Sequence, residues 1–324
     1  MSYASGGLIQ ATDYNNLTWG GTQGTYISSP SNLAYILGVG NGQFGYGQSV
    51  SGINTVAAAA TVTATQWSGL LSGVNSCLAH QSGAAAQISV PTIVAGGVIT
   101  YSSALNTAVT TINTNKALYT AQGTTTTGAT FSPNYTVATT SAAQTWTFTR
   151  TVTFPSADQA RYFFNCGGQL NLVTISATNN DGTSRSGDWA TLIGTNLGSI
   201  SAIKSLTNGG RSGTGGTQNA NNTAYGYWNA GGNTTFGTGT VLQKITSTTS
   251  PYTSDFIQVG LRTNGVQGSN GDVGTILYLD FTLYSGAMSG AFNESLNVTW
   301  NHRIDIVYPE TTYLTNSWGT PTIA

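Results

Sequence analysis

Apolar residues in the first third of the chain recur with the period of a helix. Thr65 can cap a helix in which one stripe repeats at i, i+3, i+4, i+7 and i+11: Trp67, Leu70, Leu71, Val74 and Leu78. A second stripe, Leu105, Ala108, Val109, Ile112 and Tyr119, predicts a helix over residues 102–119, and Thr12 or Asp13 can cap a short helix near the start. Thr, Ser and Asn on the polar faces are weak helix formers, so these helices need packing partners. We expect residues 1–120 to be a helical attachment and assembly region, with Trp67, Leu70, Leu71 and Val74 as a candidate assembly interface.

The period changes to two in the second part of the chain. Apolar positions alternate with Thr at Trp146, Phe148, Val152 and Phe154, a pattern typical of a half-buried antiparallel strand that ends at Pro155. Further strands are expected over residues 169–178, 241–248, 255–263, 275–284 and 296–308, with a short helix over 188–197. A Thr/Gly linker is expected at 121–135. The pattern therefore predicts an α+β protein, in which an antiparallel, jelly-roll-like β-sandwich at 136–324 follows the helical region.

Charge is scarce and unevenly distributed. The 324 residues include 9 Lys and Arg and 10 Asp and Glu, and none of these lies between residues 14 and 115. A nucleic-acid-binding protein is excluded because phosphate contacts require clustered Lys and Arg, and no apolar run reaches the roughly 20 residues that cross a membrane. We interpret the uncharged segment as a surface that partners cover within an assembly. A glycan-coated surface is the alternative.

Few side chains are candidates for chemistry. Cys77 and His80 lie at i and i+3 on a predicted helix, but a zinc site needs three or four ligands, so a structural His is favoured. Cys77 and Cys166 fall in different predicted units and are expected to be buried free thiols. His302 is expected at a surface or interface. No catalytic, cofactor-binding or metal-binding residue is assigned, and the protein is expected not to be an enzyme.

Cleavage of a polysaccharide would need two carboxylates on either side of a sugar. The candidate pairs are Asp181 with Asp188 and Asp272 with Asp280. The first pair flanks a turn, where Asp commonly binds backbone, and residues 179–182 could also supply part of a calcium site. Asp280 is expected to pair instead with a cation on a neighbouring strand, Arg262 or Arg303.

A long Gly-, Asn- and Thr-rich segment spans residues 208–240. Irregular segments of this length usually have a functional or interface role. Four aromatic residues within it are candidates for contact with a subunit interface or, alternatively, a glycan: Tyr225, Tyr227, Trp228 and Phe236. Because Tyr and Trp are enriched at interfaces, the interface is favoured.

Several strings carry a resemblance to a known group. The first four lie at Ile9–Leu17, Ile36–Gln48, Thr65–Leu70 and His80–Gly83. They resemble the amino-terminal region of virion structural proteins of tailed bacteriophages, especially tail-fibre-like proteins of cyanophages and marine phages. Ala160–Gly168 resembles a second string of that group, and Ser250–Thr253 and Arg262–Gly265 fit the same pattern. The resemblance implies a location in the virion rather than a mechanism, and it transfers no catalytic residue.

These observations predict a non-enzymatic virion protein of a tail fibre, baseplate or neck appendage, assembled in the host cytoplasm and contributing to host adsorption. Its expected partners are copies of itself, as a homotrimer or alternatively as sixfold-related copies, and other virion proteins. A host-surface glycan is a further candidate partner, whereas nucleic acid and membrane insertion are not expected. A capsid decoration or head-fibre protein and a glycan-binding host-recognition module are the alternative functions.

Overall fold

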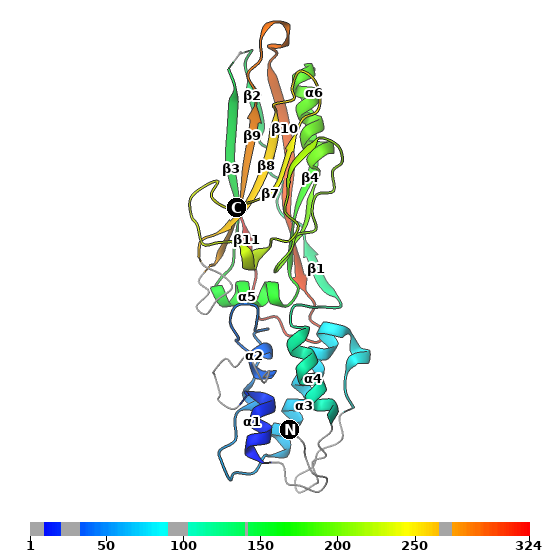
Figure 1. Cartoon of the computed structure of the whole chain (residues 1–324), viewed down its shortest axis with the longest axis vertical. Coiled ribbons are helices and arrows are strands. Elements are labelled where there is room, and N and C mark those ends of the chain that lie inside the picture. Colours follow the sequence, from blue (N-terminus) through cyan, green and yellow to red (C-terminus); the bar gives the residue numbers. More distant parts are fainter. Residues whose placement is uncertain (1–9, 21–32, 90–102, 140–141, 266–273) are drawn as a thin grey trace. The chain divides into compact units, whose positions relative to one another are not determined.

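The computed structural model describes residues 10–20, 33–89, 103–139, 142–265 and 274–324 (Figure 1). Contacts divide the chain into two units that are both discontinuous in sequence. Unit 1 comprises residues 1–123, 161–167 and 309–318, and unit 2 comprises 124–160, 168–308 and 319–324. Two segments that were expected in the β-domain, 161–167 and 309–318, therefore belong to the helical unit.

The described part of unit 1 is mainly helical. It contains α1 (Ala11–Thr18), α2 (Leu33–Leu37), α3 (Ala64–Ser82) and α4 (Ser103–Thr114), with single 3₁₀ turns at Ser51–Ile53 and Ala84–Ala86. A further helix, α5 (Ala157–Asn165), has residues in both units. The sequence predicted α1, α3 and α4 but not α2 or α5.

The helix starts differ from the predicted ones by a few residues. Gln10 is the N-cap of α1, and Asp13 is its N3 residue: the Gln10 backbone N–H donates to Asp13 Oδ2 at 2.9 Å. Thr63 rather than Thr65 caps α3, where Thr63 Oγ1 accepts from the Gln66 backbone N–H at 3.2 Å. Both starts are capping boxes, in which N-cap and N3 side chains each bind the other's backbone N–H.

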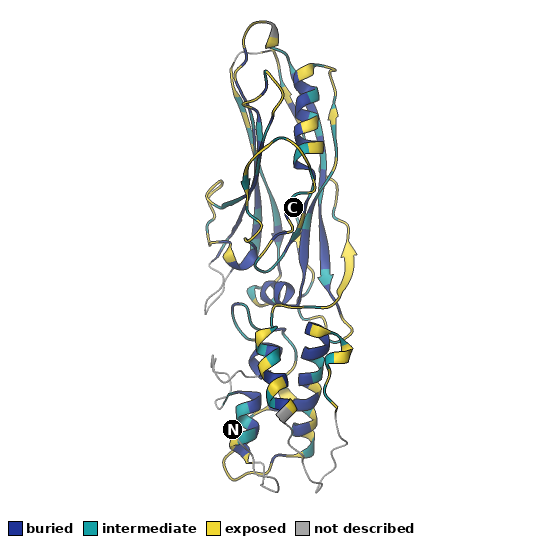
Figure 2. Ribbon diagram, turned by 45° about the vertical axis from the view of Figure 1, so that its right-hand side comes forward, coloured by how far each residue is buried: buried dark blue, intermediate teal, exposed yellow. Residues whose placement is uncertain are grey.

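The predicted assembly interface on α3 is instead the core of unit 1. Trp67, Leu70, Leu71 and Val74 are at most 4% exposed within the single chain. They pack where α2, α4 and the turn at Ser51–Ile53 contact α3, and Figure 2 shows buried and exposed residues alternating around these helices. The expectation of an intermolecular role for these four residues is therefore wrong: neighbouring helices of the same chain bury their side chains.

Both cysteines lie in unit 1, not in different units as expected. Cys77, on α3, and Cys166, which follows α5, are free and fully buried, which confirms their predicted state. Burial raises the pKa of each thiol, and the proximity of Cys77 raises that of Cys166 further. Both are therefore held as neutral thiols, which are poor nucleophiles.

Unit 2 contains two sheets of mainly antiparallel strands. One is ordered β1 (Gln122–Thr126), β10 (Leu296–Pro309), β4 (Gln169–Asn179) and β5 (Ile200–Ile203), with β2 (Asn134–Val137) also on β10. The other is ordered β11 (Thr322–Ile323), β3 (Gln144–Thr153), β9 (Ile276–Ser285), β8 (Phe256–Thr263), β7 (Thr240–Thr246) and β6 (Thr217–Asn221). The predicted strands are confirmed with small shifts at their ends.

Aromatic side chains join the two sheets. Phe281 on β9 stacks on Phe148 of β3, with ring centroids 4.6 Å apart, and meets Trp300 of β10 in the other sheet edge to face at 5.5 Å. Such pairs contribute beyond their buried area. The α+β architecture with an antiparallel β-sandwich is thereby confirmed.

The expected linker at 121–135 is an edge of the first sheet. Both β1 and β2 pair with β10, and between them Phe131 exchanges backbone hydrogen bonds with His302 at 2.8 and 2.9 Å. At Gly128 a Cβ atom would lie 2.1 Å from the Ile304 carbonyl oxygen, so only glycine permits this approach. The Thr-rich composition suits a strand because Thr is β-branched.

One helix covers part of the sandwich. It begins as α6 (Ser184–Thr191), capped by Thr183, and continues as a π-helical turn at Leu192–Leu197, four residues earlier at its start than the expected helix at 188–197. α6 packs on β4, and the π-helical turn contacts β4, β7 and β8. Among the described residues, no helix combines the length and apolarity that crossing a membrane requires.

Candidate functional site

The four aromatic residues of the 208–240 segment do not form one exposed cluster. Tyr227 is 1% exposed and Trp228 is 5% exposed, because a 3₁₀ turn at Tyr227–Asn229 directs both inward. The Tyr227 hydroxyl donates to the Gly274 carbonyl at 3.0 Å. Tyr225 is half-buried, and only Phe236 of the four is exposed. The prediction that all four contact a glycan or a subunit is therefore wrong for Tyr227 and Trp228.

A buried ion pair holds the end of this segment. Arg262 Nε and Nη2 donate to the two carboxylate oxygens of Asp280 at 2.7 and 3.0 Å. Arg262 also donates to the carbonyl of Thr234 at 2.8 Å, and Asp280 accepts from the Gly237 backbone N–H at 3.0 Å. The predicted pairing of Asp280 with Arg262 is confirmed, and this carboxylate is engaged in structure.

Asp181 also binds its own chain. Its carboxylate accepts from the Thr183 backbone N–H at 3.2 Å and from Ser295 Oγ at 3.0 Å, and although partial burial opposes the shift, hydrogen bonds from Ser186, Thr183 and Ser295 lower its pKa. Asn179 Oδ1, which belongs to the same candidate calcium site at 179–182, accepts from the backbone of Asp181 and Gly182. These oxygens therefore stabilise the turn before α6. Asp272, the fourth proposed carboxylate, lies outside the described residues.

His302 is buried in the sandwich, whereas a surface or interface position was expected. Its ring lies 4.4 Å from that of Trp300 and stacks on Phe131 at 5.6 Å. Arg150 Nε donates to His302 Nε2 at 3.2 Å. Burial, with a smaller contribution from the Arg150 charge, lowers the pKa of His302 to about 4. The ring is therefore neutral near pH 7 and serves as a hydrogen-bond acceptor.

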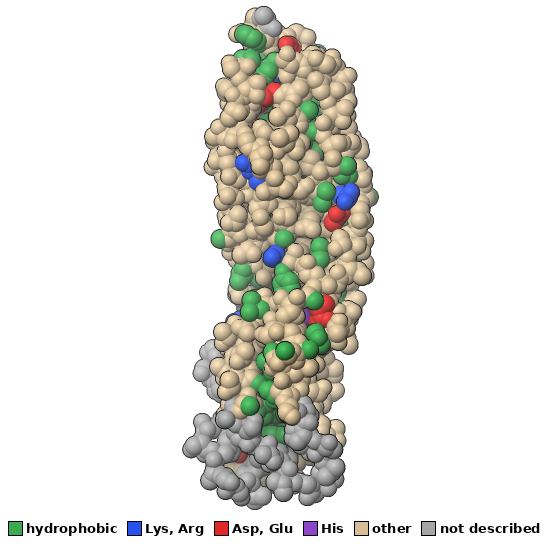
Figure 3. Space-filling model, turned by 90° about the vertical axis from the view of Figure 1, so that its right-hand side faces the viewer, with side chains coloured by type: hydrophobic (Ala, Val, Ile, Leu, Met, Phe, Trp, Pro, Cys, Tyr) green, Lys and Arg blue, Asp and Glu red, His purple; other side chains and the backbone are tan. Residues whose placement is uncertain are grey.

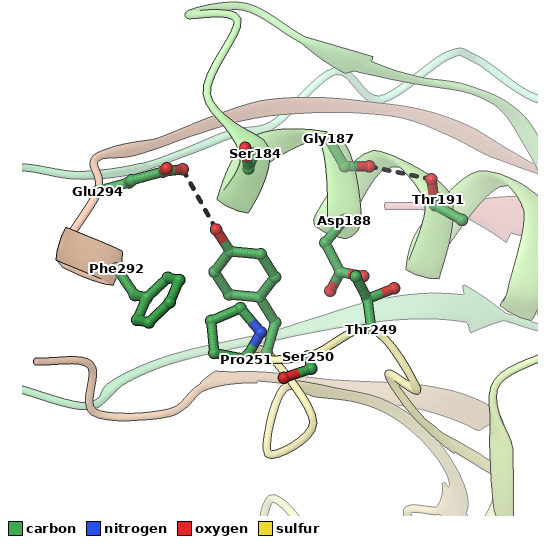
Figure 4. Close-up of a pocket in the computed structure, with 10 residues that line it drawn as sticks. Ser184, Gly187, Asp188, Thr191, Thr249, Ser250, Pro251, Phe292 and Glu294 are labelled. Atoms are coloured by element: carbon green, nitrogen blue, oxygen red, sulfur yellow. Dashed lines mark hydrogen bonds between the residues drawn. The ribbon is translucent and has the colours of Figure 1, made fainter.

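The best candidate site is a pocket beside α6, which we call the α6 pocket (Figure 4). It has a volume of about 420 Å³ and is bounded by α6, the β7–β8 connection and the β9–β10 connection. Its lining combines two carboxylates, two aromatic rings, four hydroxyls and two further residues: Asp188, Glu294, Tyr252, Phe292, Ser184, Thr191, Thr249, Ser250, Gly187 and Pro251. Small-molecule sites have this mixture and span ~300–1,000 Å³.

Asp188 lies on α6 and is only 7% exposed. Its Oδ1 accepts from Ser247 Oγ at 2.9 Å, while Oδ2 has no hydrogen-bond partner in the described part of the chain. Burial raises the pKa of this carboxyl, and the hydroxyls of Thr249 and Ser247 counteract part of the rise. One oxygen of this buried acid therefore has no hydrogen-bond partner in the described chain and is shielded from solvent.

Glu294, just before β10, is the second acid of the pocket. Its Oε2 accepts from the Arg185 backbone N–H at 2.9 Å and from the Tyr252 hydroxyl at 3.3 Å (Figure 4). Burial and the neighbouring Glu294 charge raise the pKa of Tyr252. The Glu294 carboxylate therefore holds both the start of α6 and one wall of the pocket.

A buried polar network fixes α6 against the ends of β8 and β9. Trp189 Nε1 donates to Asp255 Oδ2 at 2.7 Å, and Arg185 Nη2 donates to Ser285 Oγ at 2.9 Å. The Gly286 backbone N–H donates to Asp255 Oδ1 at 2.7 Å. Burial raises the pKa of Asp255, although these hydrogen bonds favour its charged form. Because each bond joins segments far apart in sequence, the network determines where Asp188 lies.

The sequence singled out Asp188 but paired it with the wrong carboxylate. The structure places Asp188 with Glu294 in one pocket, while Asp181 binds the turn before α6. Glu294 follows a 3₁₀ turn in the β9–β10 connection, and no local spacing relates it to Asp188. The only sequence signal for Glu294 was the rarity of its residue type, because the chain has two Glu residues.

No group of three or more His, Cys, Asp and Glu side chains able to hold a metal ion occurs among the described residues. What the α6 pocket offers chemically is a set of acceptors beside aromatic faces. Comparison of the chain with protein-family models, with curated proteins and with solved structures gives no match.

Proposed function

We propose that this chain is a non-enzymatic structural protein of a phage virion, located in a tail fibre, baseplate or neck appendage. The ordered series of strings that resemble tail-fibre-like virion proteins supports a place in the particle. The observation that carries an assembly role is the nearly uncharged surface of unit 1.

Unit 1 has four Asp, Glu, Lys and Arg residues: Asp13, Lys116, Arg161 and Glu310. Two of them, Arg161 and Glu310, are 4% and 3% exposed. Between residues 49 and 87 every exposed residue is Ser, Thr, Asn, Gln, Ala or Gly. Figure 3 likewise shows few charged side chains on one face of the molecule. A surface with so little charge has little electrostatic repulsion against close packing.

The contacts that this proposal predicts involve small polar side chains rather than the α3 core stripe. Trp67, Leu70, Leu71 and Val74 are buried within the chain, so a partner would meet the opposite face of α3, where Ser68 and Ser72 are exposed. Small uncharged residues permit close approach without desolvating a charge. Copies of the chain, as a trimer or alternatively in sixfold symmetry, and other virion proteins are the proposed partners.

The contacts of Asp181 and Asp280 support a structural role for these two carboxylates. Asp181 binds the turn before α6, and Asp280 binds Arg262. General acid–base catalysis on a sugar would require two such groups to be directed at substrate. Two of the four carboxylates considered for that reaction are therefore engaged in contacts that stabilise the fold.

Mass spectrometry and cryo-EM of purified particles of the phage that encodes the chain test the proposal. We expect the chain in the particle, in three copies per appendage or in sixfold-related copies, with unit 1 in contact with neighbours. Its absence from purified particles would reject the proposal. Density on the capsid instead of the tail would identify the alternative, a capsid decoration or head-fibre protein.

A further inference from the structure

We propose that the open edge of β3 binds an added β-strand from another polypeptide, with an acidic side chain opposite Arg150 and apolar side chains opposite Phe148 and Trp146. This proposal goes beyond the structural role above and does not depend on it, because it rests on unit 2 alone. In recognition by strand addition, backbone hydrogen bonds give affinity and the side chains of alternate residues give specificity.

Most of one edge of β3 has no partner strand in the described chain. On its other edge, β3 pairs with β9 along the whole of Gln144–Thr153. On the first edge, β11 pairs only with Thr153 and Val152 (Figure 1). Beyond β11, Thr151 exchanges two backbone hydrogen bonds with Ala324 at 2.8 and 3.0 Å. The rest of this edge, residues 144–150, is what we call the β3 edge.

The alternation of backbone groups identifies which of them are free at the β3 edge. In an antiparallel pair, every second residue directs its N–H and C=O to the same neighbouring strand. Because Thr151 directs both groups to Ala324, Thr149, Thr147 and Thr145 direct theirs to the same side. There the described chain supplies neither a donor nor an acceptor. The backbone groups of these threonines are therefore available to an incoming strand.

The exposure of side chains on the inner face of β3 follows the coverage by β11. Val152, which pairs with β11, is fully buried. Trp146, Phe148 and Arg150 are directed to the same face, where Phe148 meets Trp300 of the other sheet at 6.1 Å, yet all three are only half-buried. The uncovered part of the inner face thus coincides with the open part of the edge. Apolar side chains on an added strand would remove the remaining aromatic surface from water, which is favourable.

Arg150 determines the charge that the added strand should have. Its guanidinium lies 3.9 Å from the centre of the Phe131 ring, and its Nε donates to the neutral His302. Its Nη nitrogens have no hydrogen-bond partner in the described chain and are not shielded from solvent. Burial lowers the pKa of Arg150, and no carboxylate of the described residues forms an ion pair with it. An acid on the added strand would therefore supply a missing counter-charge.

The register places that acid directly across from the guanidinium. Since Thr151 forms a hydrogen-bonded pair, the residue opposite Arg150 on an antiparallel strand lies in a non-hydrogen-bonded pair, in which the side chains are closest. An inward-directed charge on an edge strand also discourages indiscriminate pairing. A strand without an acid would cover an unpaired guanidinium, so Arg150 makes the β3 edge selective for acidic strands.

Fluorescence anisotropy of labelled peptides with the full chain tests the proposal. The probe is the acetylated peptide Glu-Thr-Val-Thr-Leu-Thr-Ser, in which Glu, Val and Leu share one face of a strand. Two comparison peptides have Gln or Lys in place of Glu. We expect the Glu peptide to bind at least about tenfold more tightly than the Lys peptide, with the Gln peptide between them, because like charges directly opposite are unfavourable.

A charge reversal provides the sharpest variant. Arg150→Glu should reverse the preference, so that the Lys peptide binds more tightly than the Glu peptide. The matched control is Lys244→Glu, because Lys244 is also a half-buried cation over an aromatic ring, 3.9 Å from the centre of the Phe256 ring, but lies on β7 of the same sheet. Its peptide affinities should equal those of the wild type.

Amide hydrogen exchange keeps the test decisive if Arg150→Glu does not fold. In the wild type, saturating Glu peptide should slow exchange at Thr145, Thr147 and Thr149 by at least about tenfold and leave exchange on β6 unchanged. Unchanged exchange at these threonines, or binding of none of the peptides, would overturn the proposal. Equal affinities for the Glu and Lys peptides would overturn the role of Arg150. Self-association of the wild type that Arg150→Glu abolishes would assign the β3 edge to a second copy instead.

Discussion

At the scale of single residues, two buried titratable groups of the sandwich, Asp188 and His302, differ in their hydrogen bonds and in the direction of their pKa shifts. Asp188 keeps one carboxylate oxygen without a donor, and burial raises its pKa. His302 is surrounded by aromatic rings and accepts from Arg150 Nε, so burial and the guanidinium charge both favour its neutral form. The acid therefore has a buried oxygen without a hydrogen-bond partner, whereas the histidine accepts a hydrogen bond from a half-buried guanidinium.

The neutral state of His302 predicts a loss of stability in acid. Its pKa is about 4 in the folded chain against 6.5 ordinarily. Between these values the unfolded chain binds a proton that the folded chain excludes. The contribution of His302 to the free energy of unfolding is therefore complete above pH 6.5 and is lost as the pH falls towards 4. The expected loss is about 3 kcal/mol. Urea unfolding at a series of pH values across this range should show this loss in the wild type. In His302→Gln the free energy of unfolding should change less steeply with pH. Equal slopes would contradict the assignment.

The Arg262–Asp280 pair predicts a strong single-residue effect on stability. Both side chains are 5% exposed, so removing one leaves a buried charge without its partner. We expect Asp280→Ala to lower the free energy of unfolding by about 3–5 kcal/mol, and Arg262→Met combined with Asp280→Leu to cost less than the single change. Chemical denaturation measures both. A loss below about 1 kcal/mol for Asp280→Ala would show that the pair contributes little.

At the scale of elements, the start of α3 distinguishes two threonines that are two residues apart. Thr63 caps the helix, with its Oγ1 bound to the Gln66 backbone N–H, whereas Thr65 lies exposed inside the first turn. Thr63→Ala should therefore destabilise the chain by about 1 kcal/mol, while Thr65→Ala, the matched control, should stay within about 0.5 kcal/mol of wild type. Thermal unfolding of the two variants side by side decides. Equal losses would mean that the cap is not at Thr63.

The elements with a long apolar repeat were predictable, and the others were not. The α3 stripe and the alternation in β3 appear in the sequence because each buries a single face over several turns or residues. The edge formed by β1 and β2 was missed, since its Thr- and Gly-rich sequence also suits a linker. The burial of Tyr227 and Trp228 was missed because a 3₁₀ turn of three residues leaves no periodic signal.

The candidate site was predictable only in fragments. Asp188 was identified as a carboxylate near a turn, but its meeting with Glu294 depends on the network of Arg185, Trp189 and Asp255 that positions α6. Together with Glu294, these residues come from three separate segments of the chain. Sequence spacing cannot reveal contacts of this kind, because they are set by tertiary packing rather than by local periodicity.

At the scale of the whole molecule, the two units differ in how many charged residues they have and in how those residues are used. Unit 2 places several of its charged residues in buried pairs and networks, such as the Arg262–Asp280 ion pair and the network in which Ser285 joins Arg185 to Asp255. Unit 1 has four charged residues, of which two are buried. The proposed assembly role of unit 1 can therefore be tested by placing charges on it.

A variant with both Ser68→Glu and Ser72→Glu would have two negative charges on the exposed face of α3. Copies that pack through this face would then oppose like charges, so we expect the dissociation constant of the oligomer to rise about tenfold or more. The protomer should keep its stability within about 0.5 kcal/mol, because both positions are exposed and Glu is a good helix former. Sedimentation equilibrium measures the first quantity and thermal unfolding the second, with Thr178→Glu on the exposed surface of unit 2 as control. An unchanged dissociation constant in the unit 1 variant would place the contact elsewhere. A similar rise of the dissociation constant in Thr178→Glu would show that charge on either unit prevents assembly.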